Sequence, residues 1–300
     1  MAWLEPERGG CYVDCTVGLG GHAAALLERG PEARLIGFDR DPQALAQASE
    51  RMARFGGRAR LVRARFSELD RRLGELGVGR VQGVLADLGV SSLQLEVGAR
   101  GFSFQRDGPL DMRMGTTDGD DMTAQDILQS YSESEIRRVL VELGEERHAG
   151  RIAREIVARR GERPLRTTGE LRDLIEDVKG QRGGRPSRRR VHPATQTFQA
   201  LRIEVNRELD ELRSLLDQAI RRLDTDGRLV LISYHSLEDR AVKHTLRGLE
   251  RGEVDPVTGR PRAETQVIEV LTKRPVRPSA DEVARNPRSR SALLRAARRL

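Results

Sequence analysis

Short apolar runs alternate with helix-forming segments through residues 1–120 of this chain. The runs predict strands at residues 11–16, 35–38, 60–64 and 81–87. Helix formers separate the strands at residues 23–29, 43–54 and 67–76. This alternation predicts an α/β fold with a doubly wound, mostly parallel sheet. Ligands of such sheets bind at the carboxyl ends of the strands.

In the middle of the chain the apolar positions change to helical spacing. Between residues 123 and 179 they recur at i, i+3 and i+4, and residues 193–223 predict a long helix. Strand-like runs return at residues 227–233 and 267–271. We therefore predict one α/β domain made of residues 1–120 and 200–300, into which residues 121–199 are inserted as a helical domain.

The composition indicates the kind of binding partner and the cellular compartment. The net charge of +7, carried almost wholly by arginine, favours a partner rich in phosphate. A GC-rich genome accounts for much of the preference for arginine over lysine, but not for the net charge. Cys11 and Cys15 share one face of a strand, so we expect reduced core residues and no metal site. No apolar run reaches transmembrane length, and we expect a cytoplasmic protein.

A glycine-rich turn is predicted between the first strand and the first helix, in the segment Val17-Gly18-Leu19-Gly20-Gly21-His22. Asp39 ends the second strand about 20 residues later, where an acid can reach ribose hydroxyls. The turn lacks the third glycine of a dinucleotide site, which favours S-adenosylmethionine over NAD as the cofactor. A tight turn that binds nothing is the alternative.

Asp87 ends the fourth strand and is followed by small residues. An exocyclic amine is a weak nucleophile, because its lone pair is delocalised into the ring, and a carboxylate can hold its N–H groups. We therefore expect Asp87, with Ser91 and Ser92, to be catalytic; a helix N-cap is the alternative for Asp87. His22 is expected to border the cofactor through its backbone, and His235 to cap the pocket by hydrogen bonding.

Two further segments indicate loops. Residues 181–190 are basic and glycine-rich, which is typical of a loop that contacts phosphate, and a solvated linker is an equal alternative. Residues 101–114 mix aromatic, glycine and charged residues without periodicity, as a loop near a site does. The arginines that we expect to contact RNA are Arg113, Arg182, Arg185, Arg188, Arg189 and Arg190.

Six ordered blocks that span the chain resemble the MraW/RsmH family. They include Asp14-Cys15-Thr16-Val17-Gly18-Leu19-Gly20-Gly21-His22, Asp87-Leu88-Gly89-Val90-Ser91-Ser92, His192-Pro193-Ala194-Thr195-Gln196-Thr197-Phe198-Gln199 and Ser236-Leu237-Glu238-Asp239-Arg240. The resemblance implies a Rossmann-like methyltransferase domain with an inserted helical domain that helps to bind RNA. It also implies S-adenosylmethionine contacts from Gly20, Gly21, His22, Asp39, Phe66, Asp87 and Gln94. Members usually carry a further segment before the first strand, whereas only a few residues precede Cys11 here.

That family methylates the N4 amine of a cytidine in the decoding region of 16S ribosomal RNA, the RNA of the small subunit. The resemblance therefore implies this reaction, on the RNA or the assembled subunit, by a monomer or a homodimer. The alternatives are an amino-methyltransferase for DNA or protein and a catalytically silent RNA-binding assembly factor, with an NAD-dependent dehydrogenase more distant. Cytosine C5 methylation would need a thiolate near Asp87, at the end of the fourth strand, whereas both cysteines are in the first strand.

Overall fold

The computed structural model describes residues 1–115, 121–180, 192–256 and 258–300. The chain forms two compact units, which we name the sheet unit (Met1–Gly89 and Leu209–Leu300) and the helical unit (Val90–Glu208). Within the described ranges, no helix has the length and apolar character needed to cross a membrane.

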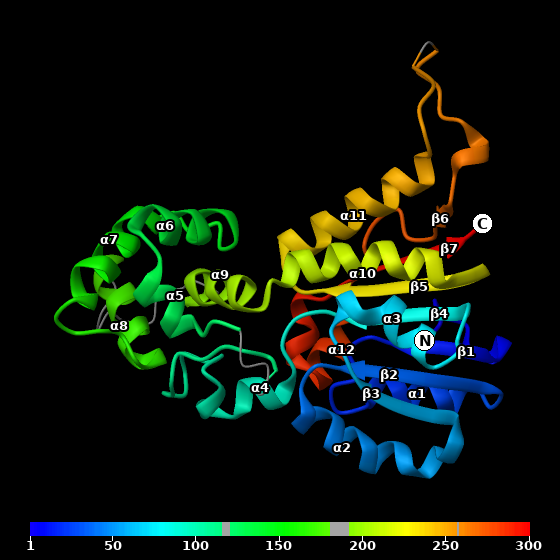
Figure 1. The fold of residues 1–300 in the computed structure, drawn as a ribbon, viewed down its shortest axis with the longest axis horizontal. Coiled ribbons are helices and arrows are strands. Elements are labelled where there is room, and N and C mark those ends of the chain that lie inside the picture. Colours follow the sequence, from blue (N-terminus) through cyan, green and yellow to red (C-terminus); the bar gives the residue numbers. More distant parts are fainter. Residues whose placement is uncertain (116–120, 181–191, 257) are drawn as a thin grey trace. The chain divides into compact units, whose positions relative to one another are not determined.

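A single seven-stranded sheet organises the sheet unit (Figure 1). Its strands are β1 (Gly10–Asp14), β2 (Ala33–Asp39), β3 (Ala59–Arg63), β4 (Val81–Asp87), β5 (Leu223–Ser233), β6 (Ile268–Val270) and β7 (Leu293–Arg299), in the order β3-β2-β1-β4-β5-β7-β6. The first five strands of this order run parallel, and β7 is antiparallel to both β5 and β6. The carboxyl ends of β3, β2, β1, β4 and β5 therefore meet at one edge, in that order.

Helices cover both faces of this sheet, and alternation along β1 shows how. Cys11, Val13 and Cys15 face one apolar core, whereas Tyr12 faces a second. The helices of the unit are α1 (Gly21–Arg29), α2 (Pro42–Met52), α3 (Leu69–Glu75), α10 (Glu208–Arg222), α11 (Ser236–Arg251) and α12 (Ala280–Arg285). Residues of α3, α10 and α11 fill the first core, and residues of α1 fill the second. The predicted doubly wound sheet is thus confirmed.

The helical unit has its own core. Its helices are α4 (Ser92–Glu96), α5 (Ala124–Ser130), α6 (Glu133–Glu142), α7 (Ala149–Arg160), α8 (Thr168–Val178) and α9 (Thr195–Asn206). Capping boxes begin α5, α6 and α8, in the last of which Thr167 and Glu170 take part. Phe102 is buried in this core, although the sequence around it has no periodicity.

The long helix predicted over residues 193–223 is wrong in one respect, because two helices stand there. Arg207 separates α9 from α10 and has a left-handed backbone, with φ of 47°. The side-chain amide of Asn206 donates to the carbonyls of Met112 and Arg202, and its oxygen accepts from the amide of Met114. These tertiary contacts, not a glycine or proline, mark the end of α9.

The unit limits also differ from the predicted domain limits. Both predicted limits, at residues 120/121 and 199/200, fall inside the helical unit, which runs from Val90 to Glu208. The reason is the segment over residues 101–114, which looked like a loop of the α/β domain. Its Leu110 and Met112 are almost fully buried in the helical core, so the segment packs with the helices.

Candidate active site

The glycine turn joins β1 to α1 at the carboxyl edge of the sheet. Gly18 and Gly20 have φ values of 52° and 78°, which a residue with a side chain rarely adopts. A Cβ on Gly20 would also approach the Cε of Met52 to 3.2 Å. The turn therefore needs glycine at Gly20, and it leaves the backbone of Gly20 and Gly21 open to a close ligand at the start of α1.

Asp39 ends β2 and holds this turn in place. Its Oδ2 accepts a hydrogen bond from the amide of Gly18 at 2.8 Å, and its Oδ1 accepts from the amide of Asp41 at 2.9 Å. Burial raises the pKa of Asp39, and these two hydrogen bonds act in the opposite direction. Each oxygen keeps a lone pair for a ligand, so the predicted role in ribose binding is compatible with this geometry and stays a prediction.

Asp14 is a further acid of this edge, and the sequence reasoning did not place it in the site. It ends β1 and is fully buried. Its Oδ1 accepts from the amide and the hydroxyl of Thr16, at 3.0 and 3.3 Å, while its Oδ2 is buried and meets no donor among the described residues. Burial raises the pKa of Asp14 to about 6. A carboxyl in an apolar strand gives no signal of such burial until the sheet is known.

Asp87 ends β4, next to β1 in the sheet. Its amide donates to the hydroxyl of Thr16 at 2.6 Å, which ties the end of β4 to the glycine turn. Its Oδ2 lies 3.4 Å from Nε2 of His22, and its Oδ1 is buried without a donor in the part of the chain that the structure describes. The predicted acceptor is therefore a carboxylate with one oxygen beside an imidazole and one oxygen unused.

The side chain of His22 has a contact that the sequence did not indicate. We expected His22 to act through its backbone, but its imidazole faces Asp87. The hydrogen bond with Asp87 raises the pKa of His22, whereas burial opposes this shift. The imidazole of His22 is thus an ion-pair partner of the Asp87 carboxylate whenever His22 is protonated.

The end of β5 brings Tyr234 and His235 to the same edge. The amide of Tyr234 donates to Oε2 of Glu238 at 3.0 Å, and Nδ1 of His235 accepts from the amide of Glu238 at 3.5 Å. His235 thus caps α11 through Nδ1, and its predicted role at the pocket stays a prediction. Burial raises the pKa of Tyr234, and the neighbouring carboxylate of Asp87 raises it further.

The predicted site residues divide between the two units. The sheet unit holds Gly20, Gly21, His22, Asp39 and Asp87 as described, and Phe66 follows β3 at the same edge, packed against the first core. Phe66 is placed there by the parallel pairing of β3 with β2, which aligns Arg63 with Asp39.

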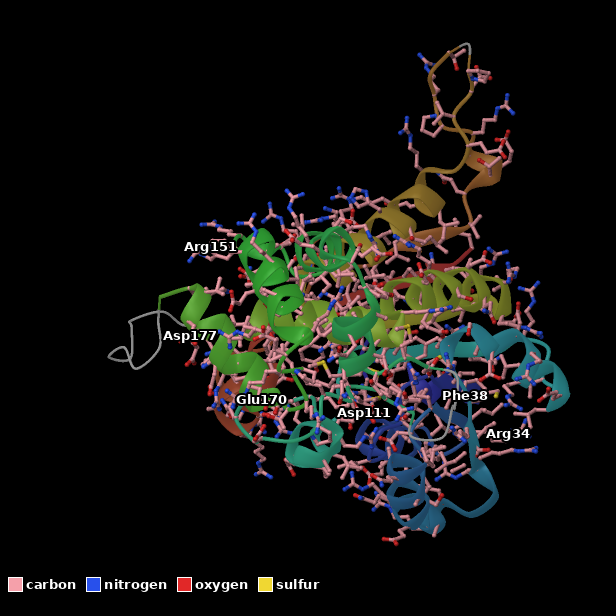
Figure 2. All side chains as sticks on the ribbon, turned by 60° about the vertical axis from the view of Figure 1, so that its left-hand side comes forward. Arg34, Phe38, Asp111, Arg151, Glu170 and Asp177 are labelled. Carbon is pink, nitrogen blue, oxygen red and sulfur yellow. The ribbon has the colours of Figure 1, made fainter. Side chains whose placement is uncertain are left out.

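The helical unit holds the remaining predicted residues. Ser91 and Gln94 form the capping box of α4, in which each side-chain oxygen accepts from the other residue's amide, at 3.3 and 3.0 Å. Ser92 is the first residue of that helix. Arg113 forms a two-pronged ion pair with Asp111, which Figure 2 labels. The arginines outside the described residues are Arg182, Arg185, Arg188, Arg189 and Arg190. The roles predicted for all of these residues remain predictions.

The chemistry of the sheet edge fits the predicted cofactor. S-adenosylmethionine carries a sulfonium and an ammonium beside a nucleoside. The edge offers two buried carboxylate oxygens that meet no donor among the residues described, Oδ2 of Asp14 and Oδ1 of Asp87, together with the backbone of the glycine turn. Unpaired buried acceptors are costly and indicate a ligand that supplies positive charge or donors.

Known proteins resemble the whole chain. Residues 1–300 match the MraW methylase family. A "Ribosomal RNA small subunit methyltransferase H" from Pseudarthrobacter chlorophenolicus is 48% identical over 295 residues, which cover 96% of this chain and 86% of that protein. Proteins of the same name from Geotalea uraniireducens and Trichlorobacter lovleyi are 48% and 47% identical, cover 100% of this chain, and are themselves covered to 96% and 95%. The predicted family, the methyltransferase class and S-adenosylmethionine as methyl donor are thereby confirmed.

Proposed function

This chain belongs to the MraW methylase family, and we propose that it transfers the methyl group of S-adenosylmethionine to the N4 amine of a cytidine in the decoding region of 16S ribosomal RNA. The observation that carries the choice of atom is Asp87. It ends β4 beside the glycine turn, and one of its buried carboxylate oxygens accepts no hydrogen bond from the described residues.

An amine conjugated to a ring needs help from an acceptor. When bound, S-adenosylmethionine supplies a methyl carbon that its sulfonium makes electrophilic. Asp87 accepts an N–H of the amine and so directs the nitrogen lone pair toward that carbon. The N–H becomes acidic as the N–C bond replaces the methyl–sulfur bond, with S-adenosylhomocysteine as the leaving group, and the carboxylate of Asp87 would then be in place to take the proton. The imidazole of His22 lies 3.4 Å from the other oxygen of Asp87, Oδ2.

The thiols of the chain argue against methylation at cytosine C5. That reaction needs a thiolate to attack the ring, and the thiolate is the nucleophilic form of cysteine. Burial raises the pKa of Cys11, and it raises the pKa of Cys15 much further. Both side chains face the first apolar core of the sheet unit. Neither thiol is therefore equipped to serve as the nucleophile.

The lysines argue against ribose methylation in the same way. Lys179 is buried in the helical unit, where its ammonium donates to Glu146 and to the carbonyl of Pro193 at 2.7 and 2.6 Å. Lys243 belongs to α11, and Lys273 is exposed in the segment after β6. Methylation of an exocyclic amine needs neither a thiolate nor a lysine. The carboxylate of Asp87 is sufficient, because it can accept the N–H of the amine.

The helical unit offers a surface for the RNA. Arg137, Arg147 and Arg151 are exposed at the junction of α6 and α7 and have no acid within ion-pair distance among the described residues. The Nε of Arg137 lies 3.7 Å from the position that a Cβ on Gly150 would take, so Arg137 lies against the first turn of α7, the turn that also holds Arg151, which Figure 2 labels. Unpaired guanidinium groups suit phosphates, and the relatives carry the name of a ribosomal RNA methyltransferase.

The deciding experiment is mass spectrometry of ribosomal RNA nucleosides. Small subunits and 16S RNA from cells that lack the enzyme would be incubated with the protein and with S-adenosylmethionine labelled in its methyl group. Labelled N4-methylcytidine supports the proposal, and labelled 5-methylcytidine rejects the chemistry assigned to Asp87. An absence of label from both substrates, with tight RNA binding, favours a silent assembly factor instead.

The RNA surface has its own test. Replacing Arg137, Arg147 and Arg151 together by glutamine should flatten the salt dependence of RNA binding by about 0.7 in the log–log slope for each single-strand phosphate that is no longer bound. Cofactor affinity should not change. Arg213, an exposed arginine of the sheet unit paired with Asp210, is the matched control. An unaltered slope in the triple variant would remove this surface from the proposal.

A further inference from the structure

We propose that the ring of Tyr234 forms one wall of a subsite for the target base, on which a pyrimidine turned out of its stack lies flat with its exocyclic amine toward Asp87. This inference rests on the proposed function and adds the subsite that function requires. A base must leave its stack before its amine can be methylated, and enzymes hold such bases between aromatic or apolar side chains.

The order of the strands separates the two ligands of the site. Along the carboxyl edge, β3, β2 and β1 present Phe66, Asp39 and the glycine turn, and β4 then presents Asp87. The next strand is β5, whose Ile232 pairs with Asp87, and Tyr234 follows two residues later. The carboxylate of Asp87 thus stands between the residues predicted to hold the cofactor and Tyr234. The target base, which receives the methyl group, must approach from the side that the cofactor leaves free, and this is the side of β5.

The contacts of Tyr234 place its ring at the turn that follows Asp87 and contains Gly89. A Cβ on Gly89 would lie 3.6 Å from Cδ2 of the ring, so the ring lies beside the turn that follows Asp87. Gly89 has φ of 98°, and without a side chain it leaves this space to the ring. The backbone of Tyr234 is itself held by its hydrogen bond to Glu238 at the start of α11. The ring is therefore positioned by rigid elements next to the group that holds the amine.

The other aromatic rings of the sheet unit lie in the apolar cores or away from the β5 side of Asp87. Phe38 is fully buried, Tyr12 is fully buried and donates to the carbonyl of Glu5, and Trp3 packs against the second core. Phe55 lies before β3, at the opposite edge, under Arg54 and Arg58. Phe66 is on the cofactor side of Asp87. Tyr234 is only half-buried and belongs to none of the apolar cores found among the described residues.

The hydroxyl and the ring of Tyr234 have separable roles. The hydroxyl adjoins the carboxylate of Asp87, and burial together with this carboxylate keeps the phenol protonated by raising its pKa. A role limited to orienting Asp87 would need the hydroxyl alone, whereas stacking needs the ring alone. Tyr234→Phe removes the first and keeps the second, and Tyr234→Leu removes both.

The first measurement is methyl transfer to small-subunit RNA. Stacking on an aromatic side chain contributes about 1–3 kcal/mol per base, so Tyr234→Leu should lower kcat/KM for RNA roughly 5- to 150-fold. Tyr234→Phe keeps the ring and loses only the hydroxyl, so it should lower kcat/KM less than Tyr234→Leu does. Phe55→Leu, which removes a ring at the opposite edge, should match the wild type. Affinity for S-adenosylhomocysteine, measured by calorimetry, should be the same in all four proteins. Equal losses in Tyr234→Phe and Tyr234→Leu would overturn the stacking role, and so would an unaffected Tyr234→Leu.

The second measurement does not require turnover. Proteins loaded with S-adenosylhomocysteine would be mixed with a single-stranded RNA that carries the fluorescent base pyrrolocytosine, whose emission falls on stacking. Quenching by the wild type and by Tyr234→Phe, but not by Tyr234→Leu, is the expected result. If this pattern holds while the wild type methylates no RNA, the proposed function fails and the base subsite stands. If the wild type methylates RNA but quenching does not depend on Tyr234, the subsite fails alone.

Discussion

A buried ion pair of the helical unit and two buried acids of the sheet unit differ in how fully their hydrogen bonds are satisfied. In the helical unit, Lys179 and Glu146 are paired at 2.7 Å with side chains only 7% and 1% exposed, and Thr197 and the carbonyl of Pro193 complete their hydrogen bonds. In the sheet unit, Asp14 and Asp87 each keep a buried oxygen that no described donor satisfies. A satisfied buried pair serves the fold, whereas an unsatisfied acceptor at the carboxyl edge of a parallel sheet indicates a ligand site.

The largest effect is expected where the unsatisfied oxygen meets the substrate. Asp87→Asn keeps the shape of the side chain but lowers its capacity to accept an N–H and a proton, so kcat should fall about 10²- to 10⁴-fold. The rate would be measured by transfer of a labelled methyl group at saturating cofactor. The matched control is Asp39→Asn at the end of β2, which should weaken cofactor affinity roughly 10- to 150-fold and spare kcat. A fully active Asp87→Asn enzyme would remove Asp87 from the chemistry.

The satisfied pair of the helical unit should matter for stability alone. Lys179→Met leaves the carboxylate of Glu146 buried without its partner, which should cost about 3–5 kcal/mol of unfolding free energy. The double variant Lys179→Met with Glu146→Gln should recover part of this loss, because no lone charge remains. Urea denaturation of the three proteins measures both values. If the single variant is as stable as the wild type, the buried pair does not stabilise the helical unit.

The contrast between these regions was only partly visible in the sequence. The strand predicted over residues 81–87 is confirmed as β4, Val81–Asp87, because an apolar run bounded by polar residues carries its own limits. Asp39 and Asp87 were found for the same reason, since each closes such a run. Asp14 was missed because the strand predicted over residues 11–16 placed it inside the strand, whereas β1 ends at Asp14. Its burial depends on β2 and β4, which flank β1.

Tertiary contacts explain the other differences. The break at Arg207 has no glycine or proline near it, and it coincides with contacts between Asn206 and the segment that holds Met112. The partner of the His22 imidazole comes from the end of β4, and the neighbour of Tyr234 comes from the turn after that strand. Local spacing predicts elements and their ends, whereas pairs brought together by the strand order require the fold itself.

The pH dependence of the free energy of unfolding can show what the burial of Asp14 costs. The pKa of Asp14 rises from the ordinary 3.8 to about 6 in the folded protein. The folded state therefore keeps a proton that the unfolded state loses between these values, so stability falls as pH rises through this window. This rise in pKa corresponds to roughly 3 kcal/mol above pH 7. Asp14→Asn should be more stable than the wild type by up to this amount at pH 8, and by much less at pH 4.

Chemical denaturation at both pH values would show the difference. Asparagine retains the oxygen that accepts from Thr16, so the comparison isolates the ionisation of Asp14. His22, Asp39 and Asp87 also influence this carboxyl and are present in both proteins. A stability difference that does not change with pH would show that Asp14 ionises in the fold as easily as in water.

The smallest and most local effect concerns His22, and it tests whether the unsatisfied carboxylate of the sheet unit is an anion. The hydrogen bond with Asp87 raises the pKa of the imidazole, with burial acting against it. Because the shift is upward, the interaction stabilises the fold fully below the ordinary pKa of histidine. It is lost as pH rises through the pKa of the folded state.

Asp87→Asn removes the charge but keeps an acceptor oxygen, so the pKa of His22 should fall toward or below its ordinary value. NMR titration of the imidazole signals, assigned with His22→Gln, would follow the shift in the cofactor-free protein. His22→Gln itself, in which the assigned signals disappear, supplies the control for this assignment. An unchanged His22 titration in Asp87→Asn would mean that Asp87 carries no charge at neutral pH, and the acceptor of the amine proton would then have to be sought elsewhere on the sheet edge.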